Sequence, residues 1–167
     1  DQRLSRGLGD VYKRQTHNKL NIALYQPDIP QNTAAIIRTA ACLGVKLMII
    51  QPTNFVFNEK KIGRIYMDYL KHCQLKFYES ANDFFDKNKE KRVILFTTKS
   101  SINYFDFKFE GNDILLFGNE TSGVSNALYK SLKYQVRIPM NKKTRSLNLA
   151  SSVSIGISEA LRQLNAK

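Results

Sequence analysis

The chain has 167 residues, enough for one domain that buries its own core, and 43% of them are hydrophobic. It carries 26 basic and 14 acidic residues, and the net charge of +12 favours a polyanionic partner such as nucleic acid, although lysine-rich surfaces can also be merely solvated. Two cysteines on separate predicted elements suit a reducing compartment better than a disulfide framework, and no apolar run approaches the roughly 20 residues that span a bilayer.

Residues 1–19 differ from the rest of the chain, because they show no strand or helix periodicity and are almost without apolar side chains. A signal peptide would have an apolar centre at this place. We therefore interpret residues 1–19 as a disordered or non-native leader and residues 20–167 as a single domain. The leader holds five basic and two acidic residues, so the remaining chain keeps a net charge of +9.

From residue 20 onward, segments typical of strands alternate with segments typical of helices. Apolar runs predict strands at residues 20–25, 45–50, 74–79, 92–98, 113–118 and 134–140. Helical periodicity predicts helices at residues 33–43, 59–72 and 147–164. A further short helix follows Ser80, which forms a capping-box-like pair with Asp83. Strands separated by helices predict an α/β domain with a parallel sheet covered on both faces.

Three polar clusters follow predicted strands, at residues 26–40, 118–123 and 138–152. Open parallel sheets bind ligands outside the carboxyl ends of their strands. Each cluster alone is weak evidence, since turns and helix caps use the same residue types, and Asn32 and Thr33 could simply cap a helix. Three such clusters in one small domain favour a binding site.

Several common catalytic signatures are absent from the sequence. It contains no GxxxxGK[ST] loop, no GxGxxG after the first strand and no GxSxG elbow. His72 and Cys73 are adjacent but lack further partners for a metal site, and His17 lies in the leader. We therefore expect neither a metal site nor histidine-based acid–base chemistry.

Taken in order, the three clusters resemble the motifs of the SPOUT superfamily of methyltransferases. IPQNTAAIIR at residues 29–38 is similar to the first motif, and FGNETSG at 117–123 to the second. IPMNKKTRSLNLASS at residues 138–152 is similar to the third. The match covers the chain from residue 20 and is nearest to the small single-domain tRNA 2'-O-methyltransferases that modify the wobble nucleotide.

This resemblance implies a fold, a cofactor and partners. The expected fold is the α/β sheet with a deep C-terminal trefoil knot, a rare exception to the rule that chains do not thread loops. The expected cofactor is S-adenosylmethionine, which becomes S-adenosylhomocysteine. The substrate would be tRNA, with cytidine or a modified uridine at the wobble position. The expected unit is a cytoplasmic homodimer, without a membrane partner, in which each site is completed across the interface.

The resemblance also implies a cofactor pocket. In it Gly118, which has no Cβ, would let a backbone amide approach the ligand. Without the resemblance, Phe96 and Ile138 would be assigned to the core. We expect Glu120 to order the pocket or the dimer contacts rather than to act as a base. The ten residues that we assign to the pocket are Phe96, Thr97, Gly118, Glu120, Gly123, Ile138, Met140, Ser146, Leu147 and Asn148.

For catalysis, the resemblance points to Arg38, Asn32 and Ser146. Arg38 lies in an otherwise apolar helix, so its side chain must either reach solvent or meet an anion. The matching arginine of the family helps to bind or activate the target nucleotide. Methyl transfer from a sulfonium is an in-line displacement that chiefly requires positioning. The alternative is that Arg38 only packs against a dimer partner.

The sequence departs from the family at four positions. Ala34 and Ala35 replace a glycine and an asparagine, Ser122 stands where an arginine is frequent, and Ser158 replaces a common tyrosine. These changes bear on RNA specificity and on activity. Two alternatives therefore stay open: a methyltransferase acting on rRNA or on another tRNA nucleotide, and a non-catalytic RNA-binding module with the same fold.

Overall fold

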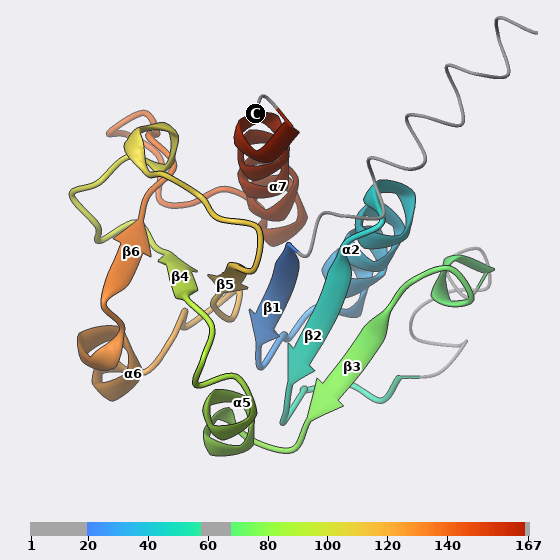
Figure 1. Cartoon of the computed structure of the whole chain (residues 1–167). Coiled ribbons are helices and arrows are strands. Elements are labelled where there is room, and N and C mark those ends of the chain that lie inside the picture. The colour runs from blue at the N-terminus through green and yellow to red at the C-terminus, as the bar shows by residue number, and fades with distance from the viewer. Residues whose placement is uncertain (1–19, 58–67, 166–167) are drawn as a thin grey trace, which may run out of the picture.

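The computed structural model describes residues 20–57 and 68–165, and its centre is a parallel sheet of six strands in the order β3-β2-β1-β5-β4-β6 (Figure 1). The predicted leader and most of the predicted helix at residues 59–72 lie outside the described residues. The strands are β1 (Asn21–Tyr25), β2 (Lys46–Ile50), β3 (Leu75–Tyr78), β4 (Val93–Phe96), β5 (Ile114–Phe117) and β6 (Tyr134–Val136). The predicted parallel α/β sheet is confirmed.

Helices cover both faces of this sheet. On one face, α2 (Pro30–Leu43) and α7 (Leu149–Asn165) lie side by side and pack on alternate strand residues such as Ile22 and Leu24 (Figure 1). On the other face, α5 (Ala81–Lys87) and α6 (Asn126–Ser131) cover the intervening residues, among them Ala23. A short 3-10 helix, η1, spans Tyr104–Asp106. None of the helices in residues 20–57 and 68–165 is long and apolar enough to cross a membrane.

Two helices begin at residues other than those predicted. Helix α2 starts at Pro30, because proline suits a first turn whose N–H groups have no helical partner. Asn32 and Thr33 therefore lie inside the helix, and the simple capping interpretation is wrong. Helix α7 starts at Leu149, two residues later than predicted, since the Asn148 Oδ1 accepts the Ala150 N–H at 2.9 Å.

Strand β6 is shorter than the predicted strand at residues 134–140. After Val136, Arg137 forms only an isolated bridge with Asn103, and Pro139 has no N–H to donate to a ladder. The predicted cap at Ser80 is present, as its Oγ accepts the Asp83 N–H at 3.1 Å. The early end of β6 leaves the following segment free to turn toward the carboxyl ends of β4 and β5.

Candidate active site

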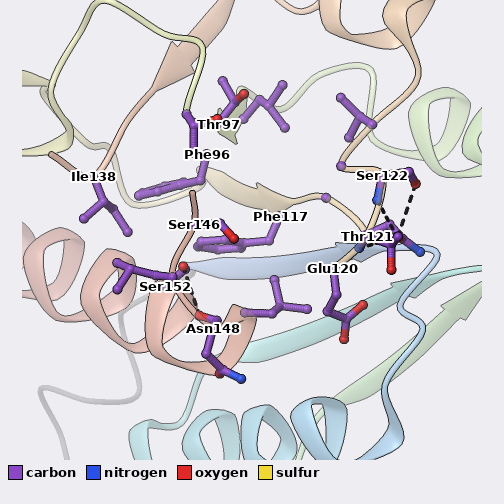
Figure 2. Close-up of a pocket in the computed structure, with 18 of the residues that line it drawn as sticks. Phe96, Thr97, Phe117, Glu120, Thr121, Ser122, Ile138, Ser146, Asn148 and Ser152 are labelled. Atoms are coloured by element: carbon purple, nitrogen blue, oxygen red, sulfur yellow. Dashed lines mark hydrogen bonds between the residues drawn. The ribbon is translucent and has the colours of Figure 1, made fainter. Parts of the chain in front are cut away.

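A cavity of about 530 Å³ lies at the carboxyl ends of β4 and β5 and takes residues from all three polar clusters (Figure 2). The structure thus brings together segments that are far apart in the sequence, at the edge of the sheet where a ligand was expected. Their part in binding a cofactor stays a prediction at this point. All ten predicted cofactor residues line the cavity, namely Phe96, Thr97, Gly118, Glu120, Gly123, Ile138, Met140, Ser146, Leu147 and Asn148.

Two stacked phenylalanines contribute to both the cavity lining and the core. The rings of Phe96 and Phe117 lie 4.6 Å apart between centroids, with 22° between their planes, and Phe96 is only 9% exposed. Helix α7 approaches these rings at Gly156, where an added Cβ would lie 2.9 Å from the Phe96 Cζ and 3.1 Å from the Phe117 Cζ. Phe96 is therefore a core residue that also lines the cavity.

The turn at residues 118–123 closes on itself. Asn119 and Gly123 exchange backbone hydrogen bonds of 2.9 Å in both directions, and Gly123 has a φ of +68°. A Cβ on Gly118 would lie 2.7 Å from the Gly123 Cα. The close approach of Gly123 thus also requires a glycine at position 118, and the expected approach of a ligand to its backbone amide stays a prediction.

The carboxylate of Glu120 caps helix α2 from a distant part of the chain. It accepts hydrogen bonds from the Asp28 N–H at 2.8 Å, the Ile29 N–H at 3.2 Å and the Asn32 Nδ2 at 3.2 Å. Ile29 is the N-cap residue of α2 and its side chain forms no cap hydrogen bond, so the carboxylate holds the backbone that leads into the helix from outside. A negative charge also suits the positive end of the helix dipole. With its oxygens so engaged, Glu120 is placed for an ordering role.

A chain of side-chain hydrogen bonds joins one residue from each cluster. The Asn148 Nδ2 donates to the Asn32 Oδ1 at 2.8 Å, and Asn32 in turn donates to Glu120. A second link runs from the Asn119 Nδ2 to the Gln26 carbonyl at 2.6 Å. The positions of the three clusters are therefore coupled directly to one another.

The three predicted catalytic residues do not all lie at the cavity of a single chain. Asn32 and Ser146 line the cavity, whereas Arg38 does not. Arg38 is exposed on α2, and its guanidinium carbon lies 5.1 Å from the centroid of the Tyr69 ring. Its side chain thus reaches solvent over an aromatic face.

Sequence reasoning missed several residues of the cavity lining, among them two cations and an aromatic ring. Lys99 and Arg145 line it, and both are exposed. Tyr129 of α6 also lines it and lies under the Lys99 ammonium. The signal that could have found the two cations is their position, one directly after a buried strand and one inside the third cluster.

The residues that depart from the family pattern lie in different environments. The Ser122 N–H and Oγ both donate to the Asn119 Oδ1, at 3.0 and 3.2 Å, so this serine stabilises the turn (Figure 2). Ala34 is buried in α2, and Ser158 is exposed on α7. Only Ser122 lines the cavity.

Groups with perturbed pKa values lie away from the cavity. Burial raises the pKa of Asp113, against the hydrogen bonds that its carboxylate accepts from the Glu110 N–H and from Arg92. Burial also raises the pKa of the Cys73 thiol to about 11. Within the described part of the chain, no group of three or more His, Cys, Asp or Glu side chains is placed to hold a metal ion.

Known proteins share both the sequence and the fold. The sequence profile of the SpoU rRNA Methylase family matches residues 19–158. A Beijerinckia indica protein named tRNA (cytidine(34)-2'-O)-methyltransferase is 42% identical over 147 residues, which are 87% of this chain and 92% of that protein. A protein of the same name from Escherichia coli strain K12 is 35% identical over 87% of this chain and 94% of its own.

Solved structures of related proteins share the fold of this chain. One from a study of the 2-OH methylation of C/U34 on tRNA has a TM-score of 0.85 and 35% identity, covering 90% of this chain and 99% of its own. The SpoU methyltransferase AviRb from Streptomyces viridochromogenes, solved with the cofactor AdoMet, has a TM-score of 0.79 and 27% identity, covering 89% of this chain and 59% of its own.

Proposed function

The chain belongs to the SpoU methylase family, and we propose that it transfers a methyl group from S-adenosylmethionine to the 2'-oxygen of the wobble nucleotide of tRNA. The two named relatives are almost fully covered by the alignment, and their names give cytidine 34 as the target. The observation that carries the proposal is the closure of the three clusters around one cavity through Asn148, Asn32 and Glu120.

The lining of the cavity fits S-adenosylmethionine, whose sulfonium supplies an activated methyl group when bound. Ile138, Met140 and Leu147 offer apolar surface for a purine ring. Ser146 offers a hydroxyl group next to the start of α7. There the Asn148 Oδ1 accepts the Ala150 and Ser151 N–H groups, so the lining beside the hydroxyl is held in place. A pocket that is apolar with a few placed polar groups is the usual environment of such a ligand.

For the RNA side, we assign positioning of the target nucleotide to Arg38 and Asn32. Arg38 is exposed and lies outside the cavity of its own chain, so it is free to serve a cavity completed by a second copy. A guanidinium can donate two parallel hydrogen bonds to a phosphate and stabilise the negative charge that develops on the 2'-oxygen. The proton of the 2'-hydroxyl needs an acceptor other than Glu120, whose oxygens are occupied by α2.

A composite site requires a homodimer, and we propose one formed through α2 and α7. These helices lie side by side on one face, and α7 leaves Ile155 only partly covered. Sedimentation at micromolar concentration should give about twice the 19.2 kDa chain mass. A monomer would contradict both the dimer and the composite site.

We further propose the C-terminal trefoil knot and a cytoplasmic location. The knot is supported by the path of the chain, since the segments after β4, β5 and β6 all meet at the cavity before α7 returns across the sheet (Figure 1). The location is supported by the proposed substrate, because the named relatives come from bacteria, whose tRNA lies in the cytoplasm.

Mass spectrometry of tRNA from a deletion strain, with and without the restored gene, tests the activity. We expect the wobble 2'-O-methyl group to disappear and then to return. A lost methyl group elsewhere in tRNA or in rRNA would assign a different target. RNA binding by the purified protein without methyl transfer would instead indicate a non-catalytic member of the family.

A further inference from the structure

Positive charge is concentrated along one part of the chain near the cavity. Residues 121–148 contain no acidic side chain but six basic ones. This segment, here called the acid-free segment, includes α6, β6 and the loop that leads to α7. The six basic residues are Lys130, Lys133, Arg137, Lys142, Lys143 and Arg145.

Lys99 lies beside this segment on a turn that is tied to β6 on both sides. Before it, the Thr97 N–H donates to the Val136 carbonyl at 2.8 Å, and the Thr97 Oγ accepts the Lys99 N–H at 3.3 Å. After it, the buried Ser100 Oγ donates to the Gln135 carbonyl at 2.8 Å. The backbone of Lys99 is therefore fixed, although its side chain is exposed.

The ammonium of Lys99 is held near the cavity without a negative partner. Its Nζ lies 5.4 Å from the centroid of the Tyr129 ring, and Tyr129 precedes Lys130 on α6. Within residues 20–57 and 68–165, Lys99 forms no ion pair. The one carboxylate in the cavity lining, Glu120, is engaged by the start of α2. The charge of Lys99 thus remains available for an anion from outside.

We propose that Lys99 is a positioning residue that binds a backbone phosphate of the RNA substrate at the mouth of the cavity, with Tyr129 holding its side chain in place. This inference rests on the proposed function and adds the surface along which the RNA approaches. An RNA backbone offers phosphates at regular intervals, so it matches the further cations of the acid-free segment. A cofactor carboxylate is a single anion and would leave those cations without a partner.

The test uses full-length protein loaded with S-adenosylhomocysteine and a tRNA transcript. The variants are Lys99→Gln, Lys99→Arg and, as a control, Lys89→Gln, an exposed lysine on the turn before β4 and outside the cavity lining. Binding is measured between 50 and 200 mM salt, together with cofactor affinity and the kcat and KM of methyl transfer. For Lys99→Gln we expect weaker RNA binding, a salt slope smaller by about 1, a raised KM for tRNA and unchanged cofactor affinity.

Lys99→Arg should keep the salt slope, because it keeps the charge, and Lys89→Gln should match the wild type. An unchanged slope in Lys99→Gln overturns the inference. Weakened cofactor binding with intact RNA binding also overturns it, since the ammonium would then bind the cofactor carboxylate. If wild-type protein transferred no methyl group while Lys99→Gln still lost the slope, the proposed function would fail and the phosphate contact would stand.

Discussion

The cavity has two walls that are built in different ways. The bonded wall, residues 26–32 with residues 118–123, is connected by side-chain hydrogen bonds between distant segments, chiefly through Glu120 and Asn119. The loop wall, residues 141–147, is exposed throughout, and its hydrogen bonds are local, such as the Thr144 Oγ to the Asn141 carbonyl at 2.7 Å. The bonded wall is thus preorganised, whereas the loop wall is free to adjust to a ligand.

The largest expected effect concerns Arg38, which lies on the helix that begins in the bonded wall but does not line the cavity. Arg38→Ala should lower methyl transfer to tRNA by about 10²–10³, or roughly 2–4 kcal/mol, if the proposed composite site places its guanidinium near the developing charge. Cofactor affinity should be unchanged, since Arg38 does not line the cavity. Lysine at this position should restore activity only in part, because it lacks the planar fork.

Radiolabel transfer and a cofactor titration on the same Arg38 variant provide the measurement. Transfer close to the wild-type rate would contradict the catalytic role. Joint loss of cofactor binding and dimer formation would show that Arg38 acts by packing against the partner.

The next effect tests how tightly the turn of the bonded wall closes. Gly118→Ala should lower the free energy of unfolding by about 1–3 kcal/mol and weaken cofactor binding, since its Cβ would overlap the Gly123 backbone. Gly111→Ala is the matched control, as a Cβ there meets nothing within 4 Å. Urea unfolding and calorimetry with S-adenosylhomocysteine measure both quantities. A Gly118→Ala protein as stable as the control would refute the close approach.

A smaller effect concerns the charge that caps α2. Glu120→Gln should lower the free energy of unfolding by about 1–2 kcal/mol, because the NH₂ group that replaces one oxygen cannot accept a hydrogen bond from the Asp28 or Ile29 N–H. Glu90→Gln, at an exposed position outside the cavity, is the control. Both variants are compared by urea unfolding. Equal stability of the two would mean that the bonded wall does not depend on this carboxylate.

The smallest effect is expected in the loop wall. Thr144→Val removes an exposed local hydrogen bond and should change the free energy of unfolding by less than about 0.5 kcal/mol. The same urea experiment applies. A loss as large as that of Glu120→Gln would erase the distinction between the two walls.

The sequence was informative about the sheet and about which residues meet at the cavity. Buried parallel strands leave continuous apolar runs such as residues 114–117, and the polar residues after each run mark the carboxyl end of the sheet. The motifs then selected residues that line the cavity, including Phe96, whose apolar side chain alone indicates only core. The end of β6 was overestimated, because Ile138 and Met140 continue the apolar pattern, whereas the ladder stops at Val136.

The connections within the site could not be predicted. Glu120 caps a helix that begins 90 residues earlier in the chain, and no local pattern reports such a partner. The start of α2 was misplaced for the same reason, since Ile29 is not a capping side chain and the cap comes from elsewhere. The stacking of Arg38 on Tyr69 and of Lys99 on Tyr129 likewise depends on tertiary packing.

The close packing of the Phe96 and Phe117 rings against Gly156 has a consequence for protein engineering. Because α7 rests directly on the Phe96 and Phe117 rings there, the helix is anchored by packing and does not rely on the preceding loop for its position. Loop grafts between related enzymes at residues 141–147 should therefore be tolerated by the scaffold. Replacement of α7 by the helix of a related enzyme would require Gly156, Phe96 and Phe117 to be exchanged together.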